Sequence, residues 1–245
     1  MSDRQAFLIR HLARPGPLQS WIRSRGLQST SRGVEHYGIV NGARRHRHPA
    51  RLFVAGPAVG LVVVMFFCYH RDRLGSGALR RELLEEHWSY MDRYTSELIA
   101  RGPTYAGDTV TGSVHIVGLP NPAAARSFAF DEPGYQAGVY RDVLLRRWRN
   151  LLGRTMWDFS GGRSEGNRYL VLGLGSAPAS SHDAVAPDSN ELIAYGPLLS
   201  DDDTAWLGTA ALVRASDPDT ARAVLTLQRY AEIEVHNWRF GGRPS

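Results

Sequence analysis

From residue 65 onward, apolar and polar positions follow patterns that predict a mixture of strands and helices. The predicted order is strand, helix, strand, strand, helix, strand. Apart from a short strand just before residue 111, the bounds of these elements are 65–70, 79–99, 111–119, 122–130 and 139–148. Asn121 and Pro122 suit the second helix, since Asn is a favoured N-cap and Pro a favoured first-turn residue. The order is that of a ferredoxin-like α+β fold.

Several short motifs of this segment recur, in the same order, further along the chain. LIARGP recurs as LIAYGP, TGS as LGT, NPAAAR as DPDTAR, and a Tyr, Trp and Arg at the same spacing close both copies. We therefore expect an α+β protein of two ferredoxin-like βαββαβ repeats, packed sheet to sheet as an intrachain dimeric α/β barrel. The closing Trp148 and Trp238 are expected to pack between the repeats.

The repeat divides the chain into segments of different character. The prediction is a basic, mostly disordered extension, a first domain, a linker, a degenerate second domain and a tail, with bounds 1–64, 65–152, 153–168, 169–241 and 242–245. The second copy is shorter where the first has its long helix and again at DEPGYQAG. Chemistry carried by those two segments would exist once per chain.

Composition places the chain among ordinary globular proteins, with 43% hydrophobic and 22% charged residues. The net charge is +5, but residues 1–64 carry ten Arg against two acids and the remainder is net −3. The basic excess therefore does not describe the folding part, and we expect no specific nucleic-acid partner. The single cysteine, Cys68, excludes an intrachain disulfide and favours a reducing cytoplasmic setting, with a buried thiol.

An uncharged run over residues 52–69 is just long enough to suggest a membrane span, but Gly56, Pro57 and Gly60 interrupt it. The alternative is a buried strand over its second half, residues 61–69. Met65 lies inside the run, so translation starting there is a further reading in which the basic segment is not made. We expect no membrane role, and a membrane anchor stays as the weaker alternative.

Chemistry is concentrated in the first copy. His87 lies on the apolar stripe of the first predicted helix, together with Tyr90, Met91 and Tyr94. It is either a satisfied core residue or a general acid or base held by a carboxylate. The carboxylates available are Asp131 and Glu132, whose alternative role is to form a solvated helix end.

EEHWSYMDR, the ARGP turn, TGSVHIV and FAFDEPGYQAGVYRDVLLRRWR resemble the YCII-related family of small ferredoxin-like proteins. The resemblance implies a dimeric α/β barrel with an active-site His and acid, which fall on His87 and Glu132. The acid here is Glu rather than Asp, and Gly134 stands in the usual place of a Tyr, so the choice between Asp131 and Glu132 stays open. Some family members resemble lyases or dehydrochlorinases acting on small aromatic compounds.

Other polar residues are weaker candidates. Gly112, Ser113 and His115 are candidate ligand-binding residues: Ser113 could donate to an anionic ligand, and His115 lies on the same face of the strand. The alternative for these residues is plain packing. Residues 201–203, three consecutive Asp, are expected to form a solvated hairpin loop rather than a metal site. GLGSAPAS does not fit a phosphate loop.

The leading hypothesis is a cytoplasmic, cofactor-free and metal-free enzyme that transfers a proton on a small aromatic or lactone molecule, as in a lyase or isomerase. The rival is a non-catalytic ligand-binding or assembly module. The two repeats would form a pseudo-dimer within the chain, which could pair again as a homodimer.

Overall fold

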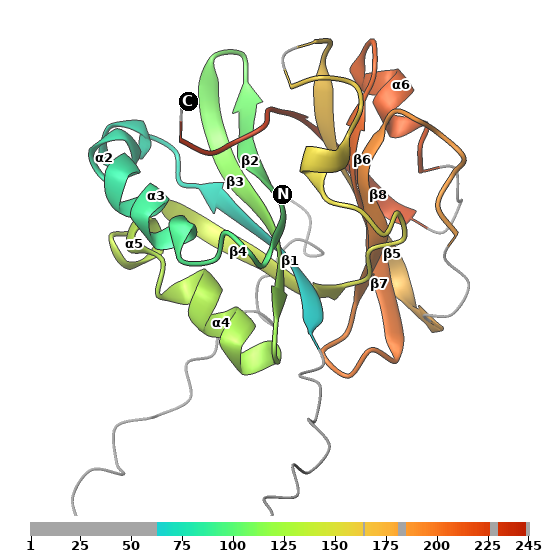
Figure 1. Ribbon diagram of the computed structural model, residues 1–245, viewed down its shortest axis with the longest axis horizontal. Helices are drawn as coiled ribbons and strands as arrows, with labels where there is room; N and C mark the ends of the chain where they lie inside the picture. The colour runs from blue at the N-terminus through green and yellow to red at the C-terminus, as the bar shows by residue number, and fades with distance from the viewer. Residues whose placement is uncertain (1–62, 164, 181–184, 226–229, 244–245) are drawn as a thin grey trace, which may run out of the picture. The chain divides into compact units, whose positions relative to one another are not determined.

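The computed structural model describes residues 63–163, 165–180, 185–225 and 230–243 (Figure 1). Its strands are β1 (Val64–Asp72), β2 (Leu98–Ala106), β3 (Thr109–Leu119), β4 (Tyr140–Trp148), β5 (Arg168–Ser180), β6 (Leu192–Leu199), β7 (Ala205–Arg214) and β8 (Tyr230–Trp238). Its helices are α2 (Gly77–Glu82), α3 (Leu84–Asp92), α4 (Pro122–Phe130), α5 (Pro133–Gln136), α6 (Pro218–Arg222) and the 3₁₀ turn η1 (Met156–Asp158). The predicted α+β class is confirmed.

The strands form one closed antiparallel barrel in the order β1-β3-β2-β8-β5-β7-β6-β4. The first four strands in sequence are neighbours, and so are the last four. Two short ladders close the barrel, with Thr104 opposite Trp238 and Leu198 opposite Trp148. Closure leaves no exposed sheet edge among these strands.

Alternation along β1 divides the core into two sides. Phe67 and Tyr69 pack into the barrel interior, where Trp148 and Trp238 are also buried. Phe66 and Cys68 point outward and pack beneath α3 and α4. Helices α2 to α5 lie beside β1–β4 and α6 lies beside β5 and β8 (Figure 1). The outer face of the first four strands is therefore the floor on which helical side chains can form a site.

The predicted helix over 79–99 is wrong in its second half. It is two helices that meet at Leu83, and the second ends at Asp92. Leu98 already belongs to β2 and pairs with Val117 of β3. Leu98 is buried in the same outer cluster as the helix residues, so its spacing fits a helix although sheet pairing determines its conformation.

The second predicted helix, over residues 122–130, agrees closely with α4. Asn121 caps α4, because its Oδ1 accepts a hydrogen bond of 2.9 Å from the backbone N–H of Ala124, and Pro122 is the first helical residue. The last strand of the first copy also falls where it was expected, as β4. These signals are local in sequence, so they do not depend on tertiary pairing.

Several other expectations concern the chain before β1 and the turns. Residues 1–62, which include the basic segment and most of the run 52–69, lie outside the described residues. The described part of that run enters β1, and no described helix has the length and apolarity needed to span a membrane. Cys68 is a free, buried thiol whose pKa burial raises. Residues 201–203 form the turn between β6 and β7, as expected for a hairpin loop.

Candidate functional site

His87 and Glu132 form a hydrogen-bonded pair. The Nδ1 atom of His87 on α3 lies 2.8 Å from Oε1 of Glu132, although the two residues are far apart in sequence. The Glu132 side chain is fully buried and that of His87 is 16% exposed. Glu132 is also the N-cap of α5, where its Oε2 accepts from the backbone N–H of Tyr135 at 2.8 Å. Both carboxylate oxygens are therefore fixed.

Glu132 is held in its ionised form. Burial by itself opposes the charge, but the hydrogen bond and charge of His87, with the Tyr135 N–H, lower the carboxyl pKa to about 2. An ionised carboxylate only accepts hydrogen bonds, so Nδ1 of His87 carries a proton. Neutral His87 then has its lone pair on Nε2, which makes that atom the candidate base.

Asp131 does not share this position. It is the exposed C-cap residue of α4, whereas its neighbour turns inward. Glu132 precedes Pro133 and has the extended backbone that a following proline imposes, with φ −66° and ψ 132°. That conformation places the Glu132 side chain at the start of α5. The structure thus brings one of the two candidate carboxylates to His87.

A cleft of about 310 Å³ opens beside His87. It lies between α3, the strands β2 and β3, and the chain that follows β8. Ser113 and His115 line the same cleft from β3, so three of the predicted site residues share one space. Ser113 Oγ accepts a hydrogen bond of 2.5 Å from Arg80, which also pairs with Asp72 at 2.9 Å.

Gly112 has a different role from its neighbours. A Cβ built there would lie 2.5 Å from the His70 carbonyl oxygen and 2.6 Å from Tyr69 Cε2. The glycine therefore permits close packing of β3 on β1. It is not among the described residues that line the cleft.

Two buried histidines surround the pair. His70 is fully buried and its Nε2 lies 2.8 Å from the Ala129 carbonyl oxygen. Burial lowers the pKa of His70 to about 4, so the ring is neutral and Nε2 donates. Burial also holds the pKa of His115 well below its ordinary value, and its ring centroid lies 5.6 Å from that of His87. The rings of His70 and His115 therefore place polar but uncharged groups next to the pair.

The sequence reasoning missed other residues of the cleft. Arg80 and Trp88 come from the helices, Arg101 from β2, and Phe240 from the chain after β8. Only one of them had a usable signal, since LIARGP and LIAYGP differ at Arg101 alone within the motif. The others are brought in by strand register and by the path of the chain end.

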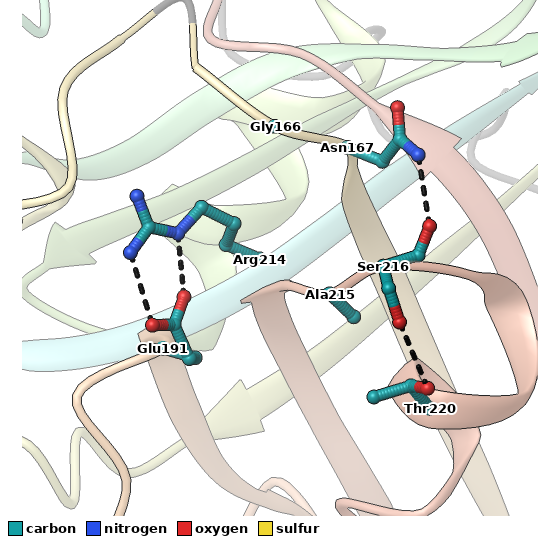
Figure 2. A pocket seen from close by; sticks show the side chains of 7 residues that line it. All are labelled: Gly166, Asn167, Glu191, Arg214, Ala215, Ser216 and Thr220. Carbon is teal, nitrogen blue, oxygen red and sulfur yellow. Dashed lines mark hydrogen bonds and ion pairs between the residues drawn. The ribbon is translucent and has the colours of Figure 1, made fainter.

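A second hollow, of about 430 Å³, lies among β5, β6, β7 and α6 (Figure 2). Its charged groups pair with each other, because Arg214 contacts Glu191 through two nitrogens at 2.5 and 2.9 Å. Ser216 Oγ lies 3.2 Å from Thr220 Oγ1, and its carbonyl accepts from Asn167. We therefore place the candidate site in the cleft beside His87.

The described residues contain no group of three or more His, Cys, Asp or Glu placed to hold a metal ion. Asp202 instead contacts the nearby Ser200, and Asp203 pairs with Arg149 at 3.2 Å. What the described cleft offers is a histidine whose second nitrogen is free for proton transfer.

Fold and site together define an antiparallel α+β barrel protein with a histidine–carboxylate pair beside a small cleft. Residues 63–149 match the YCII-related domain. Both members of the pair lie within the matched residues. A comparison with curated proteins finds no match.

Two solved structures are similar to parts of this chain. One is 5-chloro-2-hydroxyhydroquinone dehydrochlorinase from Burkholderia phenoliruptrix, in complex with 2,5-dihydroxybenzoquinone, with 26% identity and a TM-score of 0.34. The match covers 35% of this chain and 93% of the dehydrochlorinase chain. The other is an anthrone oxidase-like protein with 9% identity and a TM-score of 0.45, covering 73% of this chain and 91% of its own.

Proposed function

We propose that this protein is an enzyme that transfers a proton on a small molecule, with His87 as the general base and acid and Glu132 as the group that orients it. The observation that carries the proposal is the 2.8 Å hydrogen bond between a fully buried carboxylate and a histidine that lines a cleft. Attack by a thiol nucleophile is less well supported, because the one described cysteine is buried outside the cleft with a raised pKa.

The proposed step needs only these two side chains and the substrate. Nε2 of His87 removes a proton from a carbon or oxygen of the substrate, and its electron pair stays with the substrate. The resulting imidazolium is stabilised by the Glu132 carboxylate, which remains ionised. The proton is then returned to another atom of the substrate, which is an isomerisation. Alternatively, the electron pair forms a new double bond while a leaving group departs with the electrons of its own bond and takes the proton from His87, which is a lyase step.

We also propose that the chain is a pseudo-dimer of two ferredoxin-like halves, 65–152 and 169–241. Matched contacts at the two closing ladders support this. Thr104 is opposite Trp238, and Leu198 is opposite Trp148, in equivalent registers. The Arg that follows each Trp then donates its backbone N–H to a proline carbonyl, at 3.2 Å to Pro103 and 3.4 Å to Pro197.

In the described part of the second half, neither of the two buried histidines that flank the pair has a histidine as its counterpart. The strand ladders make Gly173 the counterpart of His70 and Ala211 the counterpart of His115. The space above Gly173 is taken by the Tyr230 ring, whose hydroxyl lies 2.9 Å from Thr209 Oγ1. One working site per chain follows from this proposal.

The test is turnover of a panel of phenolic and lactone compounds by the wild type and by His87→Gln. His236→Gln is the matched control, because His236 also pairs with a glutamate, Glu234 at 2.9 Å, outside the residues that line the cleft. We expect a loss of about a hundredfold or more in His87→Gln alone. Binding of panel compounds with no turnover by either protein would instead identify a non-catalytic binding module.

A further inference from the structure

Arg101 is a cation that lines the cleft without a close acid. Its side chain is 17% exposed, and the nearest carboxylate oxygen recorded, Oδ1 of Asp92, lies 4.0 Å from Nη1, at the limit of an ion pair. Within the described part of the chain, its buried Nε has no hydrogen-bond partner. A half-buried guanidinium whose Nε is left without a partner is costly unless an anion joins it.

The surrounding charged groups do not neutralise the positive charge of Arg101. Asp92 is engaged more closely by Arg243, whose Nε lies 2.8 Å from Oδ2. Arg163 adds a further positive charge near Arg101, and burial lowers the Arg101 pKa. Arg80, the other arginine of the cleft, differs because Asp72 lies 2.9 Å away and neutralises it.

The second half supports a ligand role for this charge. Arg101 is opposite His115 in the β2–β3 ladder, and Tyr195 is opposite Ala211 in the equivalent β6–β7 ladder. In the second half, Tyr195 thus stands in the place of the cation where Ala211 stands in the place of His115. Barrel closure, which both halves share, does not require an arginine at this position.

Size and lining limit the shape of a ligand. A cleft of about 310 Å³ is at the low end of ligand pockets, which span about 300–1,000 Å³. Trp88, Met91 and Phe240 supply apolar and aromatic surface to it. Those dimensions and surfaces suit one ring, packed on an aromatic side chain, with one charged substituent.

We propose that the cleft binds a singly charged, single-ring aromatic anion, a carboxylate or phenolate, whose charged oxygen pairs with Arg101 while its ring packs near Trp88 and Phe240. This names the substrate class of the proton-transfer site and rests on that proposed function. Arg101 sets the preference for an anion, and His87 acts on the ring or its substituents.

The test compares binding of benzoate with that of benzamide, which has the same shape and no charge, by calorimetry on the full chain. The wild type should bind benzoate at least about tenfold more tightly. In Arg101→Gln this preference should disappear while benzamide binding is unchanged. Arg81→Gln is the control, because Arg81 is exposed on α2.

Equal affinity of the wild type for benzoate and benzamide would overturn the inference. A preference for benzoate that survives in Arg101→Gln would also overturn it. So would the absence of binding of either compound at millimolar concentration. The wild-type comparison does not depend on any variant folding. Failure of the proposed function gives a different result, since benzoate would still bind selectively while His87→Gln changed no turnover. Turnover of neutral compounds that requires His87 but not Arg101 would refute the proposed preference for an anion and leave the proposed proton transfer standing.

Discussion

Replacing Glu132 with glutamine should separate folding from proton transfer. The glutamine keeps the shape of the side chain, but it has one accepting oxygen where the carboxylate had two. Its oxygen can still accept from the Tyr135 N–H, a bond of 2.8 Å in the wild type. Its NH₂ group must then face Nδ1 of His87 and can only donate to it. His87 is thereby driven to the tautomer with its proton on Nε2, which cannot act as a base toward the cleft.

The stability cost follows from the same contacts. Two hydrogen bonds to a charged group become neutral ones, a difference of about 1 kcal/mol each. The carboxyl pKa gives a similar figure, because a fall from 4.5 to about 2 corresponds to about 3 kcal/mol at neutral pH. We expect Glu132→Gln to be less stable by about 2–3 kcal/mol, a size that leaves a typical domain folded.

The sign of the pH dependence is fixed by the lowered pKa. Ionised Glu132 stabilises the fold fully above its ordinary pKa of 4.5, and this contribution is lost as the pH falls toward about 2. The stability difference between wild type and Glu132→Gln should therefore be constant near neutral pH and fall to about half near pH 3.

Urea unfolding across this range measures the difference in stability, and ¹⁵N NMR of the imidazole reports the tautomer of His87. A difference that does not change with pH would refute the reasoning. So would a variant in which neutral His87 keeps its proton on Nδ1.

Three further predictions concern the surroundings of the site. Burial lowers the pKa of His70 from 6.5 to about 4, so the wild type should lose up to about 3 kcal/mol as the pH falls across that interval. His70→Gln, followed by urea unfolding, should lack this loss, and an unchanged slope would contradict it. Gly102→Ala should lower the unfolding temperature, because a Cβ there would overlap the Arg239 carbonyl oxygen, whereas Gly77→Ala in α2 has room and should not. Arg243 ties the chain after β8 to α3, so Arg243→Ala should speed amide hydrogen exchange in both segments with little change in unfolding temperature. Unchanged exchange would count against that tie.

The parts of the fold that were predictable are those with local causes. The α4 cap depends on two adjacent residues, Asn121 and Pro122, and both behave as their chemistry requires. Strand β2 was missed because Leu98 continues the helical spacing of α3 while pairing with a distant strand. Residue spacing alone cannot distinguish the end of α3 from the start of β2 when one apolar cluster buries residues of both.

The site was predictable to a similar degree. The stripe that carries His87 is a local pattern, but the sequence left the choice between Asp131 and Glu132 open. The structure decides it, with Glu132 extended before Pro133 and placed as the N-cap of α5. Arg101 had a signal, because it is the one position at which LIARGP and LIAYGP differ, but its place in the cleft follows from β2 pairing, which that motif does not predict. Phe240 reaches the cleft from the far end of the chain, and no pattern near it indicates that path.

Proton transfer by His87 is tested most directly by exchange with solvent deuterium. The wild type is incubated in ²H₂O with phenolic and lactone compounds, and ¹H NMR follows the loss of carbon-bound hydrogen signals. We expect exchange with the wild type and with His236→Gln, and a rate lower by about a hundredfold or more in His87→Gln. Exchange at the wild-type rate in His87→Gln would contradict the account.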